Sequence, residues 1–129
     1  ISVSCSSKSK ELSSALRKHK NDSGIENIRE LIKSKDYDMA FYKSAAFGYS
    51  DIVAGLVKFG ADINSKSSDG STTLITLLRE GNIKAAGILI ENGADMTIKD
   101  GSGKKALDYL KNKKDIWRFN IRDKLYTNQ

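Results

Sequence analysis

The sequence predicts an all-α solenoid, in which helix–turn–helix pairs stack side by side and short hairpin loops join one pair to the next. One observation is an internal repeat: Gly60–Asp62 recurs 33 residues later as Gly93–Asp95, and the same offset relates Leu74 to Leu107. Another is that turn signals rich in Gly, Asp and Asn separate short stretches with apolar residues at helical spacing. One such pair cannot bury its own apolar stripe, so copies must stack.

The unit between the two Gly-Ala-Asp copies indicates where each helix begins and ends. Ser68–Thr72 supplies a turn signal followed by hydroxyl groups that can cap a helix, and Thr73–Arg79 is the first predicted helix. Glu80–Asn82 breaks the run, and Ile83–Glu91 is the second predicted helix, with a broad apolar face. Gly93 permits the left-handed conformation that ends such a helix. Each unit is therefore a turn, a helix, a tight turn, a second helix and an extended loop.

Several motifs of this unit carry a family resemblance. Ser71–Ile75 stands where the ankyrin repeat has its Thr-Pro-Leu-His signature, Gly81–Asn82 stands for the Gly-His between the helices, and Gly60–Asn64 stands for Gly-Ala-Asp-Val-Asn. Residues 37–110 thus resemble three ankyrin repeats, which implies that family's fold. The signature Pro and His are both missing, and Tyr42 occupies one of the His positions. Without the fixed φ of that Pro, a less rigid stack than the family's usual one is expected.

The chain divides into four predicted segments. Residues 1–10 are rich in Ser and Lys and are expected to form a disordered N-terminal tether. Residues 11–36 carry apolar residues at helical spacing without the hairpin signature, and are expected to form an N-terminal capping helix pair. Residues 37–110 hold the repeats. Residues 111–129 are expected to form a C-terminal capping helix and tail, with Trp117 covering the end of the stack.

Composition argues against chemistry at a catalytic or metal site. The 129 residues carry a net charge of +6 with one Cys and one His, which excludes sites needing several such ligands. His19 lies in a Lys-rich stretch and is expected to be an exposed surface residue. Gly101–Lys104 resembles a phosphate loop superficially, but Ile98 and Lys105 stand where that motif needs Gly and Ser or Thr. No catalytic residue, cofactor or metal is expected, and the chain is not expected to be an enzyme.

The resemblance to ankyrin repeats implies a partner protein bound across the hairpin tips and the concave groove made by the first helices. The implied binding residues are Phe47, Lys66, Ser68, Asp69, Ser71, Arg79, Glu80, Lys99, Ser102, Lys104, Asn112 and Lys113. Two interpretations stand for Phe47, an interface anchor or a ring that packs against the N-terminal cap. The implied groove has mixed charge and is more basic toward the C-terminus, which favours an acidic or mixed partner. With a cap predicted at each end, a monomer is expected.

Two other functions compete with this one. Val3–Cys5 and the Ser-rich stretch after it resemble the junction of a bacterial lipoprotein, in which the Cys is lipidated. The module would then be membrane-tethered in the periplasm as an inhibitor, immunity or accessory factor. With Cys5 unmodified, it would be cytoplasmic or a secreted effector. The other alternative is a basic patch over Lys104–Lys124 that binds nucleic acid or other anions, although no nucleic-acid-binding motif accompanies these charges.

Overall fold

The computed structural model describes residues 2–110, and side chains from Lys10 onward. The predicted C-terminal capping helix, with Trp117, Asn112 and Lys113, lies outside the described residues. The described elements are helices α1 (Ser2–Lys18), α2 (Ile25–Lys33), α3 (Tyr37–Ala46), α4 (Ser50–Phe59), α5 (Thr73–Arg79) and α6 (Ile83–Glu91), and the 3₁₀ helix η1 (Ala106–Tyr109). This part of the chain contains no strand, so the predicted all-α class is confirmed.

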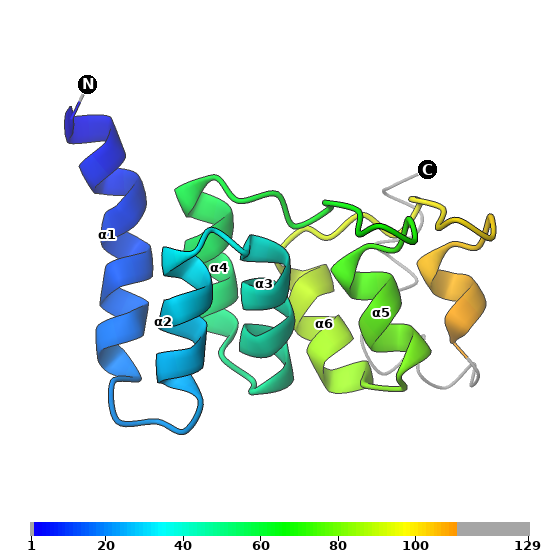
Figure 1. The fold of residues 1–129 in the computed structure, drawn as a ribbon, viewed down its shortest axis with the longest axis horizontal. Coiled ribbons are helices and arrows are strands. Elements are labelled where there is room, and N and C mark those ends of the chain that lie inside the picture. Colours follow the sequence, from blue (N-terminus) through cyan, green and yellow to red (C-terminus); the bar gives the residue numbers. More distant parts are fainter. Residues whose placement is uncertain (1, 111–129) are drawn as a thin grey trace.

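The helices form a row of stacked pairs, with the long hairpin loops along one edge (Figure 1). α5 and α6 have the bounds predicted from the sequence. Helix α3 packs against α4 of its own pair and against α5 and α6 of the next pair. Helix α5 packs in turn against η1, which opens the third unit. Each pair is thus completed by its neighbour, as the repeat pattern predicts.

Side chains and glycines define the helix ends. Thr72 accepts a hydrogen bond from the Ile75 amide at 3.3 Å at the start of α5. Asn82 does the same for the Ala85 amide at 3.2 Å at the start of α6. At the end of α4, Gly60 has a φ of 112°, a left-handed conformation that favours a residue without a Cβ. These local signals fix helix lengths independently of the packing.

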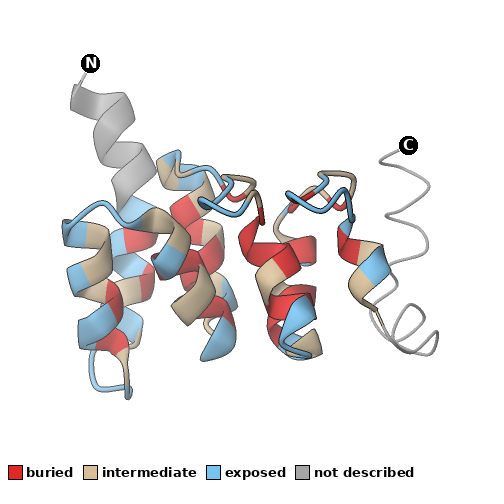
Figure 2. Ribbon diagram, turned by 45° about the vertical axis from the view of Figure 1, so that its right-hand side comes forward, coloured by how far each residue is buried: buried red, intermediate tan, exposed pale blue. Residues whose placement is uncertain are grey.

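The core runs along the interior of the row. The fully buried large side chains include Phe41 of α3, Ile52 and Leu56 of α4, Leu74 and Leu77 of α5, and Leu89 of α6. Figure 2 shows the buried residues on the helix surfaces that meet inside the stack, with exposed residues at the turns and loop tips. Burying each such side chain is worth roughly 1.5–3 kcal/mol. The hydrophobic effect therefore acts both within each helix pair and between neighbouring pairs.

In the N-terminal helix pair, the first and second helices occupy the opposite layers from those of the repeats that follow. In the repeats, first helices pack on first helices and second on second, as α3 does on α5 and α4 on α6. In the N-terminal pair, α1 packs on α4 and α2 packs on α3. Figure 1 shows the consequence, because α1 runs opposite to α4 while α3 and α5 run in the same direction. The predicted capping pair is therefore a helix pair that packs with its layers exchanged.

Helix α1 lies unusually close to α4. A Cβ on Gly55 of α4 would lie 2.9 Å from the Cα of Leu12, so only glycine allows this approach. Leu12 and Ala15 are buried in the resulting contact. The helix begins at Ser2, so it includes residues 2–10, for which the sequence predicts a disordered tether.

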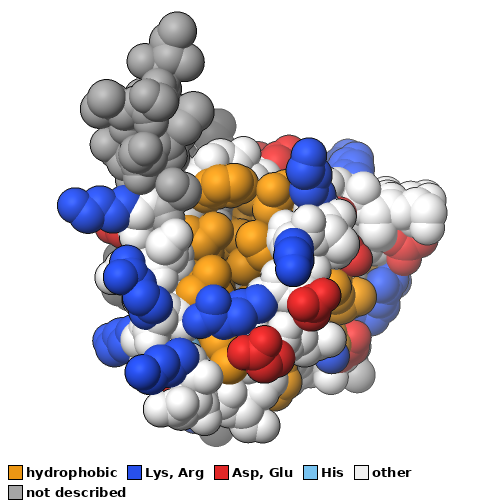
Figure 3. Space-filling model, turned by 60° about the vertical axis from the view of Figure 1, so that its left-hand side comes forward, with side chains coloured by type: hydrophobic (Ala, Val, Ile, Leu, Met, Phe, Trp, Pro, Cys, Tyr) orange, Lys and Arg blue, Asp and Glu red, His pale blue; other side chains and the backbone are white. Residues whose placement is uncertain are grey.

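The N-terminal end of the molecule carries an apolar area bordered by Lys and Arg side chains (Figure 3). Helices α1 and α2 form this end, and their half-buried residues Leu16, Leu31 and Ile32 pack against the core.

No described helix is both long enough and apolar enough to cross a membrane.

His19 ties the α1–α2 turn to the first repeat, contrary to the expectation of an exposed surface residue. Its Nδ1 lies 2.5 Å from a carboxylate oxygen of Asp22, and its Nε2 lies 2.8 Å from one of Asp51, the second residue of α4. The ring is half-buried, with its centroid 4.4 Å from that of Tyr49. Both nitrogens can donate at once only in the protonated imidazole. The hydrogen bonds to Asp22 and Asp51 accordingly raise the pKa of His19, against the opposing effect of burial.

The close approach of α1 and α4 yields a first prediction. Gly55→Ala places a methyl group against the α1 backbone at Leu12 and should displace α1, lowering the free energy of unfolding by about 1–3 kcal/mol. Urea denaturation followed by circular dichroism measures the change. The control is Lys58→Ala, which removes only the exposed ion pair of Lys58 with Glu11 and should cost at most about 1 kcal/mol. Equal effects of the two substitutions would contradict the close packing.

The His19 contacts yield a second prediction, on pH. Because the pKa of His19 is raised above the unfolded value of 6.5, its contribution to stability is full below pH 6.5 and is lost as pH rises through the folded pKa. The melting temperature of the native protein, relative to that of His19→Gln, should fall between pH 6 and pH 9. The imidazole signals in an NMR titration give the folded pKa directly. A value at or below 6.5 would refute the assignment of both carboxylates to His19.

Candidate binding groove

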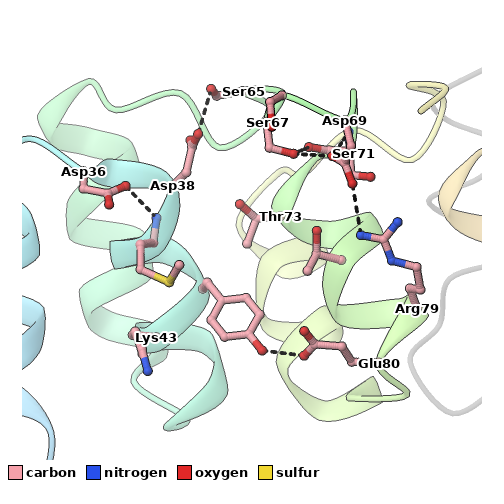
Figure 4. A pocket seen from close by; sticks show the side chains of 14 residues that line it. Asp36, Asp38, Lys43, Ser65, Ser67, Asp69, Ser71, Thr73, Arg79 and Glu80 are labelled. Atoms are coloured by element: carbon pink, nitrogen blue, oxygen red, sulfur yellow. Dashed lines mark hydrogen bonds and ion pairs between the residues drawn. The ribbon is translucent and has the colours of Figure 1, made fainter. Parts of the chain in front are cut away.

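A groove lies between the first helices of two successive repeats and the hairpin loop that joins them. Its volume is about 710 Å³, and α3, α5 and loop residues 65–71 form its walls (Figure 4). The lining residues are Asp36, Asp38, Met39, Tyr42, Lys43, Ser65, Ser67, Ser68, Asp69, Ser71, Thr73, Thr76, Arg79 and Glu80. A hollow of this size accepts side chains of another molecule.

Helix α3 supplies one wall. Asp38, Met39, Tyr42 and Lys43 line the groove, and their spacing places them on one helical face. The opposite face carries buried residues, Phe41 among them, that fix the orientation of the helix. Met39 is 41% exposed, which makes it a large apolar side chain left in contact with solvent at the groove. Methionine is flexible and polarizable, so it can adapt to an incoming apolar group.

Helix α5 supplies the opposite wall and is tied to α3 across the groove. The Tyr42 hydroxyl donates a hydrogen bond to the Glu80 carboxylate that follows α5 (Figure 4). This hydrogen bond, with burial adding to it, raises the pKa of Tyr42 above its usual value of 10.0. The phenol is therefore neutral at physiological pH and keeps its proton for Glu80. Thr73 and Thr76 add hydroxyl and methyl groups between the two ends of this wall.

The hairpin tip forms a hydrogen-bonded rim above α5. Asp69 accepts hydrogen bonds from the Ser67 hydroxyl and, at 3.0 Å, from the Ser71 amide, and lies 3.5 Å from a guanidinium nitrogen of Arg79. These donors, Ser67 first among them, lower the pKa of Asp69 to about 2. The carboxylate is thus ionised throughout the physiological range. The Asp69 side chain thus contacts both the hairpin turn and Arg79, the last residue of α5.

The next hairpin tip repeats this design. Asp100 accepts hydrogen bonds from the Tyr109 hydroxyl, from both the amide and the hydroxyl of Ser102, and from the Lys104 amide. The Tyr109 hydroxyl is the largest cause of a pKa near 2 for Asp100. The Gly101 amide donates to the Asp69 carbonyl at 3.3 Å and so links the two tips. The rim therefore continues from one repeat to the next.

The groove brings together some of the residues predicted from the sequence and leaves others apart. The predicted residues that line it are Ser68, Asp69, Ser71, Arg79 and Glu80. Lys66, Lys99, Ser102 and Lys104 are exposed on the hairpin tips, outside the lining. Lys104 places its Nζ 5.6 Å from the centre of the Tyr109 ring. Most of the basic patch predicted over 104–124 lies outside the described residues.

Phe47 packs against the N-terminal cap and stays partly exposed, and its role as an interface anchor stays a prediction. Its ring packs against the N-terminal cap, because a Cβ on Gly24 would lie 2.8 Å from ring atoms of Phe47. Its ring centroid is also 6.0 Å from that of Tyr49. Nevertheless 48% of the residue is exposed. It caps the C-terminal end of α3, and it is not among the residues that line the groove.

Sequence reasoning missed the α3 wall. Asp36, Asp38, Met39, Tyr42 and Lys43 line the groove, but only the C-terminal ends of the first helices were selected from the family resemblance. Tyr42 occupies the position of the His in the family's Thr-Pro-Leu-His signature, and this substitution was the signal that could have indicated the α3 wall. The helical spacing of Asp38 and Tyr42 would have extended the selection along the same face.

The groove is lined by charges of both signs, with more carboxylates than cations. It carries four carboxylates (Asp36, Asp38, Asp69 and Glu80) against two cations (Lys43 and Arg79). The Lys residues behind the prediction of a groove that is more basic toward the C-terminus lie on the hairpin tips or outside the described residues. Among the described residues, no group of three or more His, Cys, Asp or Glu side chains could hold a metal ion.

A row of stacked helix pairs with hairpin tips and a groove along the first helices defines a repeat-type binding module, and comparison with known proteins agrees. Residues 3–116 match the model of a family described as ankyrin repeats (3 copies). The chain belongs to the ankyrin-repeat family, which confirms the resemblance drawn from residues 37–110.

Similar proteins come from diverse organisms. The chain is 35% identical over 74 residues to Protein HOS4 of Saccharomyces cerevisiae, covering 57% of this chain and 7% of that protein. It is 32% identical over 82 residues to Protein phosphatase 1 regulatory subunit 12A of Mus musculus, covering 64% of this chain and 8% of that protein. It is 34% identical over 68 residues to Potassium channel AKT1 of Oryza sativa subsp. japonica, covering 51% and 7%. The chain spans less than a tenth of each of these relatives.

Proposed function

We propose that this protein is a non-catalytic module that binds a partner protein in the groove between α3, α5 and the hairpin loop 65–71. The observation that carries the proposal is Met39, a large apolar side chain that is 41% exposed in a hollow of about 710 Å³. An apolar anchor surrounded by polar groups is the usual composition of a protein-binding site. The ankyrin repeat is itself generally an interaction fold.

The groove is held open before any partner arrives. The Tyr42–Glu80 hydrogen bond links its two helices, and the Asp69–Arg79 ion pair links the hairpin tip to α5. On the other wall, the Ser65 hydroxyl donates to Asp38 at 3.3 Å. A surface that is already ordered loses less conformational entropy on binding, which favours affinity. A partner would therefore meet a preformed site.

Relatives support an accessory role for the module. One of them is, by its name, a regulatory subunit of a protein phosphatase, and this chain matches 8% of its length. Whether the module acts as inhibitor, scaffold or escort follows from the partner. The lipid tether at Cys5 and the basic patch over 104–124 stay predictions of the sequence.

Site-specific photo-crosslinking tests the proposal. With p-benzoylphenylalanine in place of Met39, a partner from the source cells should be captured. The same crosslinker at Lys84, an exposed residue of α6 outside the groove, should not capture it. The captured partner should be lost when excess unmodified protein competes. Capture at Lys84 without capture at Met39 would place the binding surface elsewhere.

A further inference from the structure

The groove has a charge opposite to that of the whole chain. The sequence carries a net charge of +6, whereas the groove lining has more carboxylates than cations. A second hollow of about 240 Å³ adjoins it and shares Asp36, Asp38 and Ser65 with it. Lys35, Tyr37 and Asp62 complete this hollow, so it adds one carboxylate and one cation. The groove and the hollow together form a continuous negative depression on a basic protein.

The negative charge is concentrated at one end of the depression. Asp69 is balanced by Arg79 at 3.5 Å. At the end of the depression near the start of α3, the carboxylates accept hydrogen bonds from neutral groups. Asp36 accepts one from the Met39 amide at 3.3 Å, and Asp38 accepts one from the Ser65 hydroxyl at 3.3 Å. Asp62 likewise accepts from the Asn64 amide at 2.9 Å. Among the described residues, none of these three carboxylates has a cation within ion-pair distance.

An apolar contact point lies directly beside this negative end. Met39 follows Asp38 in α3, and Tyr42 lies about one helical turn further along the same wall. The side chains of Met39 and Tyr42 can therefore receive one apolar group between them. Lys43 lies beyond Tyr42, at the other end of the wall, where the Glu80 carboxylate lies as well.

We infer that the groove accepts an extended peptide segment in which a large apolar side chain is flanked by Lys or Arg. The apolar side chain packs on Met39 and Tyr42, and the flanking cations lie against Asp36 and Asp38. This inference rests on the groove being the binding surface, and it adds the chemistry of the partner.

Charge complementarity favours this occupant over others. An acidic peptide or a nucleic acid would bring its charge against Asp36, Asp38 and Asp62, which have no balancing ion pair. Arg79 would attract an anion only weakly, because its guanidinium group is already paired with the Asp69 carboxylate. A wholly apolar segment would leave these carboxylates desolvated without a partner, which is costly. A cationic segment with one apolar anchor satisfies both the carboxylates and Met39.

Three fluorescein-labelled octapeptides with one glycine–serine frame test the inference by fluorescence anisotropy. The first carries a leucine flanked by lysines, the second replaces the lysines with glutamates, and the third replaces the leucine with serine. The first peptide should bind at least about tenfold more tightly than either of the others at low salt. Its affinity should fall as sodium chloride is raised. Equal binding of the lysine and glutamate peptides would overturn the inference.

Variants of the protein locate the binding. Asp36→Asn with Asp38→Asn should weaken the lysine peptide about fivefold or more, and Met39→Ser should weaken it as well. Asn at position 36 preserves the cap of α3, so the helix is retained. The control is Glu91→Gln, an exposed carboxylate of α6 outside the groove, which should leave binding unchanged. If Glu91→Gln weakens binding as much as the double variant does, the peptide responds to overall charge and the inference is wrong.

The proposed function (partner binding in the groove) and the inference about the peptide's chemistry can be tested separately. If crosslinking at Met39 captures a partner that the lysine peptide does not displace, the groove binds proteins of other chemistry and only the inference falls. If the lysine peptide binds and Met39→Ser has no effect, the peptide sits elsewhere and the inference is overturned. If neither a partner nor the peptide contacts Met39, the proposed function fails together with the inference.

Discussion

The structure depends on the burial of α3 and α4 between neighbours on both sides. Phe41, Ile52 and Leu56 are fully buried, and no single helix pair of this length could shield them. The N-terminal pair covers one side and the α5–α6 pair the other. Because this interaction holds the first helices parallel and side by side, it also creates the groove between α3 and α5. Stability and the proposed binding surface therefore arise from the same stacking.

The two ends of α3 have different roles. At its C-terminal end, Phe47 and the neighbouring turn pack on the α1–α2 turn, where His19 bridges Asp22 and Asp51. At its N-terminal end, Asp36 and Asp38 face the groove and have no ion pair among the described residues. Charge at the first end is balanced by ion pairs within the fold, whereas the carboxylates at the second end have none among the described residues. This contrast separates residues that hold the cap from the residues that we propose to meet a partner.

The sequence predicted the repeats closely, and in the N-terminal region it predicted a helix pair but not how that pair packs, for physical reasons. The bounds Thr73–Arg79 and Ile83–Glu91 followed from capping residues and glycines, which act locally and can be read from neighbouring positions. The exchange of layers by α1 and α2 depends on Gly55 meeting Leu12, 43 positions away, and no local pattern reports such a contact. His19 was misjudged for the same reason, since Asp51 is distant in sequence. In the groove, the α5 side and its hairpin followed from the repeat motif, but Met39 required knowing which side of α3 is left uncovered.

Contact between a partner and Met39 can be measured directly, because the chain has two methionines in different surroundings. Met39 is 41% exposed and lines the groove, whereas Met96 is 2% exposed in the core. With ¹³C-labelled methionine methyl groups, an NMR titration with the photo-captured partner reports both sites at once. If the partner binds in the groove, the Met39 signal should shift or broaden while the Met96 signal keeps its position. Saturated binding with an unchanged Met39 signal would contradict the proposed binding in the groove.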